Sequence, residues 1–188
     1  DGTRRRDLPQ GRSPFPDADV LFFGETENPQ YEHRKTLLTA MREAGIRVET
    51  YNYSGPARTE QKVYEWQDRA IRAAPLCLSM SLTNHATGYT SARLFDLAQA
   101  GGTILGERFP GCEELFRSDE VVWFDDDAEA IRKAKALLHG DRTHLRKFGN
   151  RAWWRVRGAH TMTARLRVLE RAGRAIRSGA PIPQGWRV

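Results

Sequence analysis

The sequence predicts an α/β domain of the Rossmann-like, three-layer kind, built on a parallel sheet and followed by a basic helical tail. Three observations predict it: short apolar runs typical of buried strands, amphipathic segments between these runs, and glycine or proline where the segments end. Near the start, a strand, a helix and a strand follow one another within about 30 residues, which is the order of a βαβ unit.

Each expected element has a local signal. The apolar run Val20-Leu21-Phe22-Phe23 precedes Gly24, a helical spacing of Leu37, Leu38 and Met41 ends at Gly45, and Pro75 ends the second helix. We expect strands at 20–23, 46–51, 76–80, 103–105 and 121–124. We expect helices at 31–45, 60–74 and 92–100, from 125–127 to Gly140, and through most of the remainder.

Composition divides the chain into three parts. Residues 1–18 are rich in proline, glycine and arginine, which indicates a tail or linker. Residues 19–140 carry the alternating elements. Residues 141–188 are expected to form C-terminal helices that pack on this domain through two apolar stripes. The stripes are Leu145, Phe148, Ala152 and Val156, and Leu166, Leu169 and Ile176.

The overall composition is that of an ordinary globular domain, with 188 residues, 39% hydrophobic and 29% charged. No apolar run is long enough for a transmembrane helix, and no signal-peptide pattern opens the chain. Cys77 and Cys112 lack the spacing of a zinc site or a disulfide framework, so we expect a reducing, cytoplasmic location. The chain starts at Asp1, which favours a processed product or a fragment.

Positive charge is concentrated near the end of the chain. Between Arg142 and Arg177 there are eleven Lys and Arg residues and a single acid, Glu170. This stretch is either an attractor for phosphate-bearing partners or a solvated helical face. Trp153-Trp154 among the arginines raises the possibility of base stacking. We favour packing for the tryptophans, with one on the core and the other on a neighbouring domain, and do not expect a nucleic-acid partner.

The segment from Gly88 to Gly102 carries the strongest functional signal. It follows an expected buried strand, and ligands of open parallel sheets bind beyond the carboxyl ends of the strands. The amides at a helix start suit a diphosphate, and Thr90 and Ser91 add hydroxyl groups there. Asp96 lies just over one turn into the helix, where a carboxylate can accept from a ribose diol. The alternative is that Thr90 and Ser91 are only helix caps and Asp96 is a surface acid.

Four motifs in order resemble the spore-maturation CgeB-like glycosyltransferases, which have the GT-B fold of glycosyltransferase families 1 and 4. Residues 91–102 (SARLFDLAQAGG) are similar to the S-x-R-x-F-E-x-x-A-x-G-G segment of that family. The other three matches are Phe109–Phe116, the strand Glu120–Phe124, and Arg157–Arg165, which resembles its H-T-[YW]-x-x-R segment. The likeness covers roughly residues 18–175.

The resemblance implies roles for several residues. Asp96 stands where the family has the glutamate that binds the nucleotide ribose, and is one methylene shorter. Arg93 stands beside the phosphates or braces the loop. Related enzymes carry an acid seven or eight residues before that glutamate, but Gly88 and Tyr89 occupy those places here.

The loop from Gly24 to Arg34 is the second candidate implied by the family. Related enzymes place a cation near this turn against the diphosphate, and Arg34 and Lys35 are available; the alternative is a solvated cation in the first turn of the helix. His85 lies in the loop that faces the expected ligand, and is either a contact of the sugar or phosphate or simply exposed. No metal or other cofactor is expected, and Asp125-Asp126-Asp127 indicates a helix cap.

These observations favour a glycosyltransferase that transfers a sugar from a nucleotide diphosphate sugar, UDP-linked, to an unknown acceptor. The resemblance implies that the chain is the C-terminal, donor-binding half of a GT-B enzyme. No catalytic residue is assigned, because an acceptor domain or partner chain usually supplies any general base. The alternatives are a non-catalytic nucleotide- or anion-binding module and, third, a nucleic-acid binder.

Overall fold

The computed structural model describes residues 14–51 and 61–181, and the side chains of residues 61–64 are left out. Most of the predicted tail, the predicted helix start at residue 60 and the last seven residues therefore lie outside the described residues. The strands are β1 (Val20–Phe23), β2 (Val48–Tyr51), β3 (Leu76–Ser79), β4 (Ile104–Glu107) and β5 (Val122–Phe124). The helices are η1 (Pro29–Tyr31), α1 (Glu32–Glu43), α2 (Gln61–Ala73), α3 (Ala92–Gln99), α4 (Cys112–Leu115), α5 (Asp127–Leu138), α6 (Arg142–Ala159) and α7 (Met162–Ser178).

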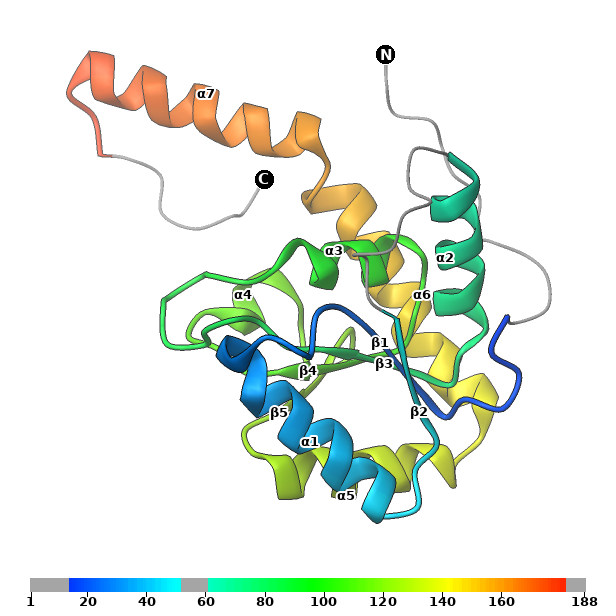
Figure 1. The fold of residues 1–188 in the computed structure, drawn as a ribbon. Helices are drawn as coiled ribbons and strands as arrows, with labels where there is room; N and C mark the ends of the chain where they lie inside the picture. Colours follow the sequence, from blue (N-terminus) through cyan, green and yellow to red (C-terminus); the bar gives the residue numbers. More distant parts are fainter. Residues whose placement is uncertain (1–13, 52–60, 182–188) are drawn as a thin grey trace.

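The five strands form one parallel sheet in the order β2-β1-β3-β4-β5. Side chains alternate along β1: Val20 and Phe22 pack toward α1 and α5, whereas Leu21 and Phe23 pack toward α2, α3 and α6. The helices therefore cover both faces of the sheet (Figure 1), and the predicted three-layer α/β arrangement is confirmed. The strand order reverses between β1 and β3, and such a switch point is where doubly wound sheets bind ligands.

All residues of β1 and β3 are buried, whereas Glu49 and Thr50 of β2 are exposed. Cys77 is fully buried in β3, and burial raises the pKa of its thiol to about 12, so it is a structural thiol at neutral pH. Asp126 caps α5 by accepting from Glu129 N at 2.8 Å, as the acidic turn predicts. Strand β4 is longer than predicted and reaches Glu107, because Gly106 continues the strand instead of ending it.

The two C-terminal helices differ in their packing. Helix α6 lies along the domain, with Leu145, Ala152 and Val156 buried. Helix α7 extends away from the domain (Figure 1), and its large apolar side chains are exposed. These are Met162, Leu166, Leu169 and Ile176, with exposed fractions of 71%, 56%, 67% and 64%. No helix among the described residues is long and apolar enough to cross a membrane.

Two aromatic contacts test the expectations for the N-terminal tail and for Trp153-Trp154. Phe15, from the predicted tail, packs edge-on against Trp66 of α2 at 5.4 Å, so the described end of that segment belongs to the domain. Trp153 is half-buried beneath the guanidinium of Arg157, whereas Trp154 is 66% exposed. Neither tryptophan is fully buried.

Candidate functional site

The candidate site lies at the switch point, where β1 and β3 end side by side and α3 begins. Arg93, in the first turn of α3, spans this point. Its Nε donates to the carbonyl of Phe23, at the end of β1, and its Nη1 donates to the carbonyl of Met80, just after β3, at 2.6 Å. The guanidinium also lies 4.7 Å from the centre of the Phe22 ring. These are the bracing contacts that the sequence left open as an alternative to a phosphate contact.

Gly24 makes room for Arg93. A Cβ added to Gly24 would overlap Nη2 of Arg93 and lie 3.0 Å from its Cζ. The predicted glycine is therefore required by the close approach of a side chain. Because Gly24 has no side chain, the positive charge of Arg93 lies directly at the switch point.

The start of α3 is an open cap, meaning a helix start whose N-cap side chain forms no capping hydrogen bond. Of the two predicted caps, Thr90 and Ser91, the N-cap residue is Ser91, but its side chain makes no capping hydrogen bond, and its buried Oγ has no partner. By contrast, Asp126, Asp141 and Thr161 each accept an N–H from the helix that they cap. Ser91 N instead donates to Ser81 Oγ at 3.2 Å, and that hydroxyl lies 3.4 Å from Thr90 Oγ1. A buried hydroxyl without a partner is costly unless a ligand satisfies it.

The other predicted cation, Arg34, is buried, with 4% of its surface exposed. Its Cζ lies 4.0 Å from the Tyr31 ring centre, Nη1 donates to Glu25 O at 3.2 Å, and Nε has no hydrogen-bond partner. Burial lowers the pKa of Arg34. The alternative of a solvated first-turn cation is therefore wrong.

The first βα loop already holds a carboxylate. Glu25 Oε1 accepts from Thr26 N at 2.9 Å and from Glu27 N at 2.8 Å. The amides that would face a phosphate are thus occupied, and the carboxylate would repel one. The start of α3 is the better location for a diphosphate.

Three polar residues that were not predicted from the sequence lie near Arg34: His33, Asn84 and Glu107. Glu107, the last residue of β4, accepts from Asn84 Nδ2 at 3.0 Å, and His33 Nε2 lies 3.1 Å from Ser81 O. Burial raises the pKa of Glu107, and the charge of Asp127 adds to this, while His33 and Arg34 oppose it. The strand prediction stopped before Gly106, so Glu107 was not recognised as a residue at the carboxyl edge.

The two remaining predicted residues are accessible. Asp96 is exposed on α3; partial desolvation and the neighbouring charge of Asp68 raise the pKa of its carboxyl, and Arg93 opposes this. His85 is exposed in the loop before α3, and its imidazole forms no hydrogen bond or ion pair with the described residues. Over the same part of the chain, no three His, Cys, Asp or Glu side chains lie close enough together to hold a metal ion.

Comparisons with known proteins identify the family of the chain. A family model described as glycosyl transferase-like matches residues 30–171, which is most of the chain; β1, Gly24 and the first part of the adjoining loop lie outside the match. The chain belongs to the glycosyl transferase-like family. No curated protein sequence matches it significantly.

Solved structures extend the family's likeness to the GT-B fold. An α1,3-fucosyltransferase is 16% identical, with a TM-score of 0.54 over 72% of this chain and 38% of its own. A structure of an α1,3-fucosyltransferase with GDP-fucose is 15% identical, with a TM-score of 0.54 over 70% of this chain and 38% of its own. Sucrose-phosphate synthase from Thermosynechococcus elongatus is 11% identical, with a TM-score of 0.57 over 87% and 47%. The chain thus spans less than half the length of these structures, and the likeness concerns the fold.

Proposed function

We propose that this member of the family is the donor-binding half of a glycosyltransferase and takes a nucleotide diphosphate sugar at the β1/β3 switch point. The observation that carries the proposal is the open cap of α3: a buried hydroxyl without a partner, at a helix start, beside the fixed charge of Arg93. The CgeB-like motifs favour a UDP-linked donor and the C-terminal half of a GT-B enzyme.

The chemistry asked of these residues is stabilisation of a leaving group. As the glycosidic bond breaks, negative charge accumulates on the diphosphate. The positive end of α3 and the hydroxyls of Thr90 and Ser91 offset that charge without reorganising. Asp96 holds the ribose in this proposal, and His85 faces the sugar from the loop. The base that activates the acceptor is assigned to a second domain or a partner chain.

A non-catalytic nucleotide-binding module is the second candidate, and one observation favours it. The position seven or eight residues before Asp96 carries Gly88 and Tyr89 instead of an acid. A module would bind the nucleotide sugar without turnover, even when supplied with an acceptor half. An enzyme would release free nucleoside diphosphate.

The proposal is tested by the thermal stability of three proteins with UDP-, GDP-, ADP- and CMP-sugars. At a hundredfold over its Kd, a ligand adds about 2.7 kcal/mol of stability. We expect a UDP-sugar to stabilise the parent, and Ser91→Ala to lose most of that gain without losing stability of its own, because its Oγ has no partner. The control is Thr161→Ala, which removes a bonded cap, so it costs about 1 kcal/mol and keeps the nucleotide response. Failure of every nucleotide to stabilise the parent contradicts the proposal.

A further inference from the structure

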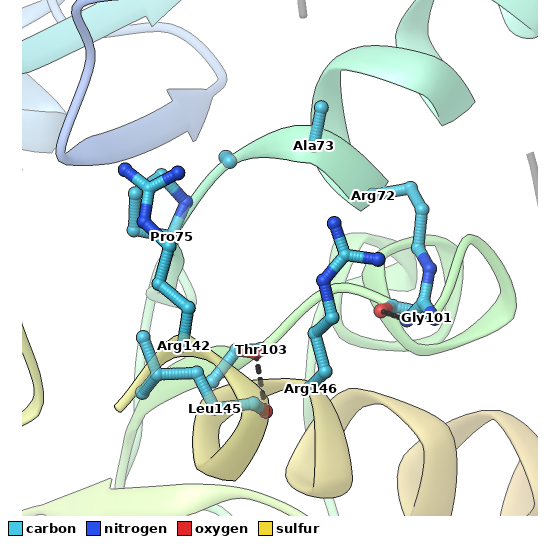
Figure 2. Close-up of a pocket in the computed structure, with 9 residues that line it drawn as sticks. Arg72, Ala73, Pro75, Gly101, Thr103, Arg142, Leu145 and Arg146 are labelled. Carbon is cyan, nitrogen blue, oxygen red and sulfur yellow. Dashed lines mark hydrogen bonds between the residues drawn. The ribbon is translucent and has the colours of Figure 1, made fainter. Parts of the chain in front are cut away.

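A second polar pocket lies at the opposite edge of the sheet, at the amino ends of β3 and β4. Its walls are the end of α2, the turn between α3 and β4, and the first two turns of α6 (Figure 2). Three arginines line it: Arg72 from α2, and Arg142 and Arg146 from α6. Figure 2 shows the side chain of Arg142 extending from α6 toward Pro75, and that of Arg146 extending from α6 toward the end of α2 at Ala73.

One of the three arginines is fixed in place by uncharged partners. Arg72 Nη1 donates to Gly101 O at 2.7 Å, and its Nη2 donates to Asn150 Oδ1 at 2.9 Å. Burial lowers the pKa of Arg72, and the positive charge of Arg146 lowers it further. The guanidinium is therefore held beside a like charge, and neither of its bonds to Gly101 and Asn150 supplies a counter-charge.

The nearby acids are already engaged. Asp141 Oδ1 accepts from Thr143 N at 2.8 Å as the cap of α6, and Asp19 pairs with Arg47 at 2.7 Å. Arg142 and Arg146 form no ion pair or hydrogen bond with any residue in the described ranges 14–51 and 61–181. Three arginines thus line the pocket, and no acid lines it.

We propose that this pocket binds the phosphate group of a small phosphorylated ligand, at a site separate from the switch point. Planar guanidinium groups bind phosphate oxygens two at a time, and Arg142 and Arg146 have donors available for this. The start of the 18-residue helix α6 adds the positive end of its dipole. The pocket is small, about 30 Å³, so it can admit a phosphate group but cannot enclose a whole nucleotide.

A general attraction of polyanions to a basic protein is the competing explanation. The other arginines of α6 and α7 make a matched control available. Arg167 is exposed on α7 and forms no ion pair with a described residue, so it carries the same charge without a pocket. A discrete site needs Arg142 and Arg146 and ignores Arg167, whereas a diffuse basic surface depends on all three.

The test is calorimetric titration of the full chain at constant ionic strength with inorganic phosphate, glycerol 3-phosphate and a single-stranded oligonucleotide. Four variants are compared with the parent: Arg142→Gln, Arg146→Gln, Arg167→Gln and Ser91→Ala. We expect each of the first two to weaken binding of phosphate and of the phosphomonoester about ten- to a hundredfold, the loss of one charge-assisted hydrogen bond. Arg167→Gln should bind as the parent does, and Ser91→Ala should keep the part of the binding that depends on Arg142 and Arg146. Tighter binding of the phosphomonoester than of free phosphate identifies a ligand that carries the group; equal binding identifies the anion alone.

Three results would overturn the site. The first is phosphate binding that survives in Arg142→Gln and Arg146→Gln. The second is a loss in Arg167→Gln as large as theirs, or binding of the oligonucleotide alone, which would show a diffuse basic surface. The third is a complete loss in Ser91→Ala, which would place the whole of the anion binding at the start of α3. The proposed function is tested by nucleotide binding that depends on Ser91, and this pocket by phosphate binding that depends on Arg142 and Arg146. Either can therefore fail while the other holds.

Discussion

Gly24 leaves, at the end of β1, the space that Nη2 of Arg93 fills. The two residues are 69 positions apart in the sequence, and they come into contact only when the sheet has formed. Arg93 joins the ends of β1 and β3 through their last carbonyls. The pair therefore determines the shape of the switch point.

We expect Gly24→Ala and Arg93→Ala to be coupled. The added methyl group displaces the guanidinium and breaks its bonds to Phe23 and Met80, which should cost about 1–3 kcal/mol of unfolding free energy. In the Arg93→Ala background, the same methyl group meets no guanidinium and should cost less. Urea denaturation of the four proteins measures the coupling, expected to exceed about 0.5 kcal/mol. Additive losses would show that the overlap is relieved elsewhere.

Asp96→Asn should weaken UDP binding by about 1–3 kcal/mol, because the amide keeps the size of the side chain but loses the charge and one acceptor for the ribose diol. It should also remove most of the preference for UDP over dUDP. Calorimetry with both nucleotides measures this. Asp119→Asn, at an exposed acid before β5, is the control and should bind as the parent does. If the parent binds both nucleotides equally, Asp96 does not recognise the 2′-hydroxyl.

Gly149→Ala should destabilise the domain although alanine favours helices. A Cβ at this position of α6 would overlap the carbonyl oxygen of Gly101 and lie 3.0 Å from Gly102 C, and backbone atoms cannot move aside cheaply. The expected loss is about 1–3 kcal/mol. Gly158→Ala, in the same helix with nothing within 4 Å, should instead gain up to about 1 kcal/mol. Chemical denaturation of both variants gives the comparison, and equal effects would contradict the close contact.

Stability should fall in mild acid because of His160. Burial lowers the pKa of its imidazole below 6.5; the bond to Leu115 O opposes this, and the charges of Arg155 and Arg165 add to it. The unfolded chain then binds more protons than the folded one once the pH drops below the unfolded pKa. The folded state loses up to about 1.4 kcal/mol per pH unit until the folded pKa is reached.

The measurement is denaturation at about pH 7.5 and about pH 5.5. His160→Gln should have a smaller difference in unfolding free energy between the two pH values than the parent. His139→Gln, at an exposed histidine after α5, should retain the parent's difference. An unchanged difference in His160→Gln would assign the acid sensitivity to other groups.

The sheet is predictable from the sequence because its signals are local: each apolar run and each terminating glycine or proline can be recognised without knowing the partner strand. The position of Ser91 as a cap was predictable for the same reason. The contacts of Arg93 were not, because its acceptors are main-chain carbonyls that any residue provides. Glu107 was missed because Gly106 resembles a strand end, and the arginine pocket because Arg72 and Arg146 meet only after α6 packs against the sheet.

Helix α7 has a consequence for how the chain unfolds. Its first turn is fastened to the domain, since Thr161 caps it, His160 is buried and Arg165 lies 4.4 Å from the Phe95 ring centre. Beyond that turn, its large apolar side chains lie in water and lend it little tertiary stabilisation. An isolated helix of this length is marginally stable. Amide protons should therefore exchange with solvent progressively faster toward Ser178, in a local opening that precedes the cooperative unfolding of the sheet.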